Sequence, residues 1–201
     1  INVPQNKAKS AWEYAISCEK KCKSDMRQRG LDVLTKIKSR ELGRVFVVLG
    51  KDYNLCDKKL NSSAIEILET MGEMLITQDM LATDDGSYSG AYRTMYWSHG
   101  KEILAAAEIA AKTPNLYAIM ITNFGCGPDS FTIKYVSDIM GEKPWLLLEV
   151  DEHSSSVGME TRIEAFLDSL KDAPNIRATK SRQPFKPSIT SKSRSRIFIR
   201  R

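Results

Sequence analysis

The sequence has no apolar stretch approaching the roughly 18 residues that span a bilayer, and its first residues lack a basic region followed by an apolar run. Membrane insertion and a retained secretion signal are therefore not expected. Cysteine is also scarce, with four residues in a chain of 201. That number is too small for a disulfide framework in a chain long enough to bury its own core, and it predicts a reducing cytoplasm.

Two common kinds of chemistry lack their usual residues. Neither GxxxxGK[ST] nor GxGxxG occurs in the sequence, so the glycine-rich loops that cradle nucleotide phosphates are missing. Histidine is limited to His99 and His153, which restricts the choice of a general base. Nucleotide hydrolysis by this chain alone is not expected.

The net charge of +5 is unevenly distributed along the chain. Residues 177–201 hold nine of the 30 Lys and Arg and no Asp or Glu, which leaves 21 basic against 25 acidic residues elsewhere. Such a tail is either an arm that binds a polyanion or a solvated linker to a further domain. Because only Phe185 and Phe198 accompany the charges, the linker is favoured and nucleic acid is not an expected partner.

The spacing of apolar residues over 10–39 predicts helix, with Gly30 as an expected break. Cys18 and Cys22 lie four residues apart in this segment, and hence on one helix face. They are either a metal-binding pair or small residues on a core-facing stripe. Packing is the more common use, and the stripe would also contain Trp12, Ala15 and Ile16.

The remaining pattern alternates short β-branched runs with helical periods, which predicts βαβ crossovers and a mostly parallel sheet. The expected fold class is a doubly wound α/β domain, Rossmann-like or flavodoxin-like in three layers, with strand order 2-1-3-4 and a helical lead-in. Strands are predicted at 44–49, 73–77, 116–122 and 145–150, helices at 60–71, 92–112, 129–140 and 159–170, and a polar loop at 84–90.

The domain organisation follows from these elements. Residues 1–40 are predicted to form the helical lead-in, 41–175 the α/β domain, and 176–201 the basic linker. The first residue is Ile1, and the last few residues resemble the start of a strand, so we expect the chain to be part of a longer protein.

The loops that leave the carboxyl ends of parallel strands meet at one edge of the sheet, where α/β proteins bind ligands. In the loop at 123–129, Gly125 and Gly127 flank Cys126, directly before a predicted helix. A thiol beside a helix amino terminus favours the thiolate form, which serves as a nucleophile or a metal ligand. The alternative is a small residue that fills a tight turn.

Two further ideas depend on the loop that follows the fourth strand. His153 lies there and would be the base of a Cys126–His153 hydrolase, for which no orienting third residue is evident. Ser154 and its neighbours either cap the next helix or expose backbone amides to an anion, and Asp151 and Glu152 are candidate cation ligands. Capping is the more common use of such serines.

Three segments carry a resemblance to a known family. VVLGKDYN followed by Asn61, PNLYAIMITNFGCGPDSF, and LLLEVDEHSSSVGMETRIEAFLDSL resemble the CoA-substrate-specific enzyme activases, large proteins related to the activators and dehydratase components of 2-hydroxyglutaryl-CoA dehydratase systems of anaerobes. The resemblance runs from about Arg44 to Leu170. One departure is GKDYN where many relatives have GRPYN, so that Lys51 and Asp52 stand in place of Arg and Pro.

The resemblance implies a module of a multidomain protein, in which ATP-driven electron transfer passes through iron–sulfur clusters. Cys126 matches the family's cysteine and is the implied metal ligand, while Tyr53, Gly125, Gly127 and Ser154 are implied to line the cofactor or substrate crevice. Implied partners are flanking domains, a CoA thioester and dehydratase subunits. The alternative hypothesis is a docking or scaffold module without catalysis.

Overall fold

The computed structural model describes residues 3–81 and 95–171. It is an α/β protein with a four-stranded, all-parallel sheet in the order β2-β1-β3-β4. The strands are β1 (Val45–Gly50), β2 (Met74–Thr77), β3 (Leu116–Asn123) and β4 (Trp145–Val150). The predicted fold class, the parallel sheet and the strand order are all confirmed.

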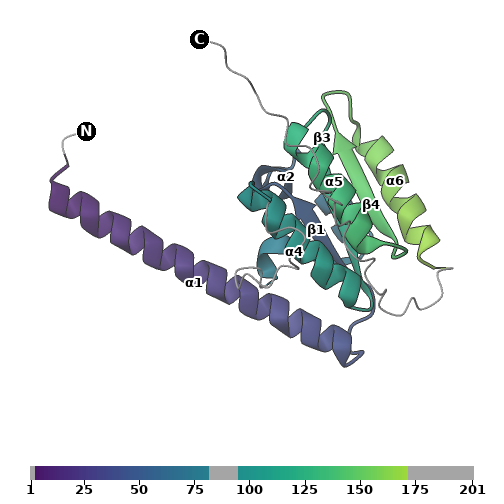
Figure 1. The fold of residues 1–201 in the computed structure, drawn as a ribbon, viewed down its shortest axis with the longest axis horizontal. Coiled ribbons are helices and arrows are strands. Elements are labelled where there is room, and N and C mark those ends of the chain that lie inside the picture. Colours follow the sequence, from purple (N-terminus) through teal and green to yellow (C-terminus); the bar gives the residue numbers. More distant parts are fainter. Residues whose placement is uncertain (1–2, 82–94, 172–201) are drawn as a thin grey trace, which may run out of the picture.

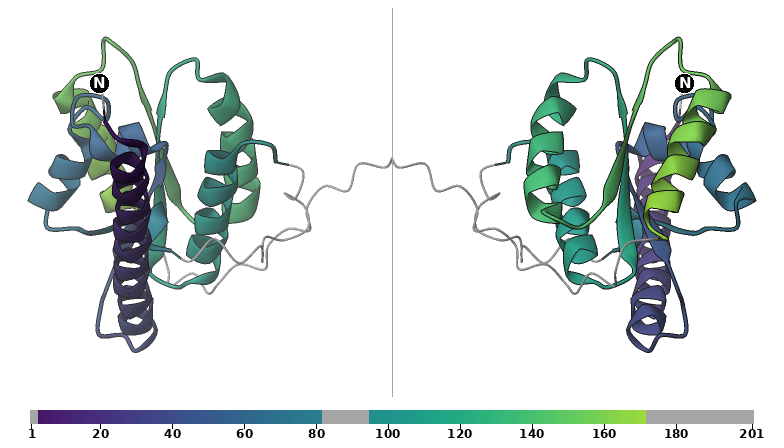
Figure 2. Two further views of the ribbon diagram at one scale, coloured as in Figure 1. Left: turned by 90° about the vertical axis from the view of Figure 1, so that its left-hand side faces the viewer. Right: turned by 90° about the vertical axis from the view of Figure 1, so that its right-hand side faces the viewer.

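Helices cover both faces of the sheet, as Figure 2 shows. One face packs on the carboxyl-terminal part of α1 (Gln5–Lys38), on α4 (Ser98–Lys112) and on α5 (Gly127–Met140). The other face packs on α3 (Ala64–Thr70) and α6 (Ser156–Ser169). Every residue of β1 is buried, as expected for a central strand between two helical layers.

Side chains of β1 alternate between the two cores. Val45, Val47 and Leu49 lie in the core beneath α4, whereas Phe46 and Val48 lie in the core beneath α6. The period of two in a strand produces this division, and it is why the sequence of β1 is apolar without interruption.

Several predicted boundaries need correction. Helix α3 begins at Ala64 rather than Leu60, because the residues before it form turns. Helix α4 begins at Ser98, whereas the prediction began at Tyr92. Two short elements at the carboxyl edge were not predicted, the helix α2 (Asp52–Cys56) and the 3-10 helix η1 (Gln78–Met80). The predicted loop at 84–90 and the tail at 176–201 lie outside the described residues.

The predicted break at Gly30 is wrong, since α1 runs through it without interruption. A Cβ at this position would lie 1.9 Å from the carbonyl oxygen of Met80, so glycine allows α1 to pack directly on the backbone of η1. Glycine in the middle of a helix costs about 1 kcal/mol relative to alanine. The close contact between α1 and η1 is the structural reason for this glycine.

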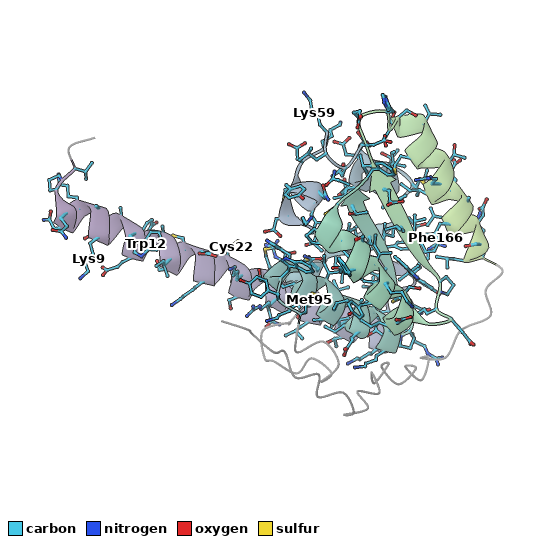
Figure 3. All side chains as sticks on the ribbon, turned by 45° about the horizontal axis from the view of Figure 1, so that its top comes forward. Lys9, Trp12, Cys22, Lys59, Met95 and Phe166 are labelled. Carbon is cyan, nitrogen blue, oxygen red and sulfur yellow. The ribbon has the colours of Figure 1, made fainter. Side chains whose placement is uncertain are left out.

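The core-facing stripe expected on the first half of α1 is also wrong. This part of the helix extends away from the α/β body in Figure 1, and Cys18 and Cys22 are exposed. Trp12 is 68% exposed. A helix that is polar around most of its circumference lacks the apolar face needed for burial, and residues 7–23 contain seven Lys and Glu. Figure 3 shows the labelled Lys9, Trp12 and Cys22 on this projecting segment.

Among the residues that the structure describes, no helix has both the length and the apolar character needed to cross a membrane.

Candidate functional site at the carboxyl edge of the sheet

The strand order places a switch point between β1 and β3. The chain passes from β1 to β2 on one side, and then returns to β3 on the other side of β1. Crossovers that leave in opposite directions separate the loops at the carboxyl ends of these two strands, which is where α/β proteins open a crevice. Lys51 follows β1 at this point, and the turn with Cys126 follows β3.

The end of β1 is held by a buried glutamine. The Gly50 N–H donates to Gln78 Oε1 at 3.0 Å, and Gln78 Nε2 donates to the Gly50 carbonyl at 2.8 Å. These two bonds replace the ladder bonds that β2 no longer supplies after Thr77. Gly50 has φ +156°, and a Cβ there would lie 2.6 Å from the Ile121 carbonyl oxygen. The two hydrogen bonds between Gln78 and Gly50 therefore fix the backbone from which the Lys51 side chain extends.

Lys51 joins the loops after β1 and β3. Its Nζ donates to Cys126 Sγ at 2.6 Å and lies 3.3 Å from Asp129 Oδ1. The Lys51 side chain is 16% exposed, and its Nζ also lies 5.8 Å from the centre of the Tyr53 ring. One ammonium group thus connects a thiol, a carboxylate and an aromatic ring from both loops.

The carboxylate of Asp129 is buried in the first turn of α5. Its Oδ2 accepts a hydrogen bond of 2.5 Å from the Thr122 hydroxyl near the end of β3, while Oδ1 faces Lys51. A carboxylate in the first turn of a helix is also stabilised by the helix dipole. We call these four residues, Lys51, Thr122, Cys126 and Asp129, the Lys51 cluster.

The pKa of Lys51 reflects opposing effects. Burial by itself lowers the pKa, but the hydrogen bonds to Cys126 and Tyr53 and the charge of Asp129 outweigh burial and raise it above 10.5. The side chain is therefore a stable ammonium at neutral pH. The structure therefore places a fixed positive charge next to Cys126 Sγ.

The structure brings some of the predicted site residues together. Tyr53 and Cys126 meet at Lys51, and Cys126 is half-buried as the N-cap residue of α5. Gly125 has φ +73°, a backbone conformation that favours glycine in this turn. A Cβ on Gly127 would meet no atom within 4 Å, so no steric demand for glycine is evident there.

Ser154 belongs to a separate turn. Its hydroxyl donates to Asp151 Oδ1 at 2.8 Å and accepts from the Asp151 N–H, and Ser155 caps α6 by accepting from the Gly158 N–H at 3.2 Å. The hydrogen bond from Ser154 lowers the pKa of Asp151, because it outweighs the opposite effect of burial. A hollow of about 280 Å³ lies beside this turn. Among the described contacts, these serine hydroxyls serve the turn and the helix cap.

The suggested pairing of Cys126 with His153 finds no support in the contacts. Cys126 has Lys51 as its hydrogen-bond partner. The His153 side chain is 85% exposed, and its Nε2 lies 3.8 Å from Glu152. An imidazole in this position faces solvent beside the turn after β4.

Sequence reasoning placed Lys51 and Asp129 in the loops at this edge but gave neither of them, nor Thr122, a role in the site. The available signal was the position of each residue at the end of a parallel strand or in the first turn of the following helix. That signal places the three residues at one edge of the sheet, but it does not pair them.

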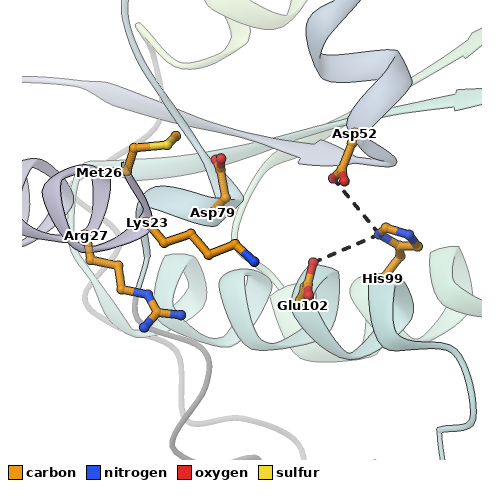
Figure 4. Close-up of a pocket in the computed structure, with 7 residues that line it drawn as sticks. All are labelled: Lys23, Met26, Arg27, Asp52, Asp79, His99 and Glu102. Atoms are coloured by element: carbon orange, nitrogen blue, oxygen red, sulfur yellow. Dashed lines mark ion pairs between the residues drawn. The ribbon is translucent and has the colours of Figure 1, made fainter. Parts of the chain in front are cut away.

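A second hollow of about 340 Å³ lies between α1 and the body (Figure 4). His99 Nδ1 is 4.0 Å from both Asp52 and Glu102, and α1 contributes Lys23 and Arg27 from the opposite side. The lining contains both signs of charge, so it favours no ligand of a single charge. The residues that line it are Lys23, Met26, Arg27, Asp52, Asp79, His99 and Glu102.

Metal ligands are sparse in the part of the chain that the structure describes. No group of three or more His, Cys, Asp or Glu side chains within it is arranged to hold a metal ion. Cys18 and Cys22 lie on the projecting half of α1, and Cys56 is exposed at the end of α2. Cys126 is therefore the cysteine that the fold places at the switch point between β1 and β3.

Residues 1–81 match the family model described as "CoA enzyme activase uncharacterised domain". This part of the chain is thus similar to a domain of CoA enzyme activases. The match covers less than half of the 201 residues, and it includes α1, β1, β2 and the loop with Lys51. Cys126 and the turn after β4 lie beyond it. No curated protein and no solved structure shows a significant match to the chain.

Proposed function

We propose that this chain is an α/β module of a CoA enzyme activase-type protein, and that it contributes the Cys126 thiolate as one ligand of an iron–sulfur cluster. The observation that carries the proposal is the position of Cys126 Sγ, at the amino terminus of α5, beside the switch point, and 2.6 Å from the Lys51 ammonium. The family match over residues 1–81 supports the activase-type role.

The donor set limits what this module can do by itself. Iron–sulfur clusters are commonly held by four cysteine thiolates, and the described residues place one thiol at the switch point. They therefore fit one ligand position and do not fit a complete site. The remaining ligands would have to come from flanking domains or from dehydratase subunits. A bound cluster would supply electron transfer.

The side chains around Cys126 have defined roles under this proposal. Lys51 orients the sulfur and offsets its negative charge, and Asp129 together with Thr122 holds Lys51 in place. Tyr53, Gly125 and Gly127 form the adjacent surface, which a CoA thioester could approach from solvent. Ser154 would contribute at the neighbouring turn. Under this proposal the protein is cytoplasmic and acts in 2-hydroxyacyl-CoA dehydration.

The test is anaerobic purification of the natural full-length protein, followed by measurement of its iron, sulfide and visible absorption. Cys126→Ser should lower the iron and sulfide content and the charge-transfer absorbance. Cys56→Ser is the matched control, because Cys56 is exposed and follows β1 at the same edge of the sheet. Unchanged iron and sulfide in Cys126→Ser would exclude Cys126 as a ligand.

A docking module without catalysis is the second candidate. Large aromatic side chains are exposed on both sides of Cys126 in the sequence, with Phe124 75% and Phe131 60% exposed. Phe131 also packs against Trp97 at a ring-centre distance of 6.3 Å. Exposed aromatic groups of this kind are common at protein interfaces. Full-length protein without iron, whose domain association weakens in Phe131→Ser, would favour this candidate.

A further inference from the structure

The side chains of Lys51 and Cys126 are in direct contact. Their Nζ and Sγ atoms lie within hydrogen-bond reach of each other, at 2.6 Å. The two atoms face each other across the switch point, and one is a nucleophilic sulfur while the other is a nitrogen. This geometry is suited to a bond between them once the sulfur is oxidised.

The surroundings hold the nitrogen in place. The Lys51 side chain is only 16% exposed. Besides its contact with Cys126, its Nζ lies 3.3 Å from Asp129 Oδ1. Asp129 is itself held by Thr122. Cys126 is half-buried, so part of the residue is exposed to solvent, the side from which hydrogen peroxide would approach. The sulfur can therefore meet an oxidant while Lys51 stays next to it.

We propose that Lys51 captures oxidised Cys126 as a covalent sulfenamide cross-link, Cys126 Sγ–Nζ Lys51. In the first step peroxide transfers one oxygen to the thiol, so that sulfur is oxidised to sulfenic acid and peroxide is reduced to water. In the second step the Lys51 ammonium first gives one proton to Asp129 or to solvent, and the free Nζ lone pair then attacks sulfur while the S–O bond breaks. The leaving hydroxyl takes a second proton from Nζ and departs as water.

The cross-link would make Cys126 oxidation reversible. Sulfenic acid that finds no partner is oxidised further to sulfinic acid, which thiols do not reduce. An added thiol opens the S–N bond, which releases the Lys51 amine and leaves a mixed disulfide that a second thiol reduces. This proposal is independent of cluster binding, because it concerns the metal-free chain.

The experiment uses the 201-residue chain with its three exposed cysteines replaced by serine, so that Cys126 is the remaining thiol. The metal-free protein is treated with one equivalent of hydrogen peroxide and analysed by intact-mass and peptide mass spectrometry. The expected product has lost two hydrogens, contains a peptide that joins residues 51 and 126, and regains its original mass with dithiothreitol.

Lys51→Arg is the informative variant, because it keeps the positive charge beside Asp129 but presents a much weaker nucleophile. It should form no link and at least fivefold more sulfinic acid than the parent at equal peroxide. Lys59→Arg, on the neighbouring exposed segment, should behave as the parent. The proposal is overturned if the parent forms sulfinic acid without a link, or if the linked product retains the oxygen atom. The link is sought in the parent protein, so folding of the variants does not decide the outcome.

Discussion

Two lysines lie at opposite ends of the sheet, one partly buried and one fully buried, and they differ in what surrounds them. Lys51, at the carboxyl ends of the strands, faces the Asp129 carboxylate and the Cys126 sulfur, and its pKa is raised. Lys143 lies just before β4, at the amino ends of the strands, and is 4% exposed. It donates to the carbonyls of Ala110 and Thr113, each at 2.6 Å, and lies 5.3 Å from the centre of the Tyr117 ring.

Burial lowers the pKa of Lys143 to about 8. Carbonyl dipoles at the end of α4 satisfy its hydrogen bonds, but they carry no full charge that would offset desolvation. Lys51, which has a carboxylate partner, therefore stays charged, whereas the charged form of Lys143, which has carbonyl partners, is disfavoured by burial. Lys51 lies in the candidate site, and Lys143 caps the end of α4.

The largest loss of stability is expected from breaking the ion pair between Lys51 and Asp129. Asp129→Ala should lower the free energy of unfolding by about 3 kcal/mol, because it leaves the Lys51 ammonium largely buried without its carboxylate. Urea denaturation followed by circular dichroism measures the change. Asp151→Ala is the control, since that carboxylate is exposed and serves only its own turn. Equal losses in the two variants would contradict the role of burial.

The pH dependence of the free energy of unfolding should reveal the lowered pKa of Lys143. Between pH 8 and the ordinary lysine pKa of 10.5, the unfolded chain binds more protons than the folded protein, so the free energy of unfolding rises with pH. Relative to Lys143→Met, the wild type should gain up to about 3 kcal/mol across this window, and no such gain below it. Parallel curves for the two proteins in urea titrations from pH 7 to 10.5 would refute the depressed pKa.

A smaller effect should come from the backbone beside Lys51. Gly50→Ala should cost about 2 kcal/mol, because the new Cβ would clash with the Ile121 carbonyl oxygen in an unfavourable φ region. Gly43→Ala, before β1 at the opposite end, should be nearly neutral because its Cβ meets no atom within 4 Å. Thermal or urea unfolding compares them, and a neutral Gly50→Ala would argue against the close approach of β1 and β3.

Much of the fold follows from local patterns in the sequence. The run from Val45 to Leu49 is apolar at every position, which predicts a strand buried on both faces, and the alternation of such runs with helices predicts a parallel sheet. The projecting half of α1 shows the limit of this reasoning. The spacing of its apolar residues predicts a helix, but that spacing alone does not show whether the helix packs against the rest of the protein.

The sequence by itself determined the parallel α/β fold and the edge at which its loops gather, because strand and helix periods are local properties and right-handed crossovers leave few topologies. It also placed Cys126 at the start of a helix. Only the tertiary structure decided that Lys51 is the partner of Cys126 and Asp129, which lie 75 and 78 positions further along the chain. Such pairing depends on strand order and burial, since charges attract strongly only where packing excludes water.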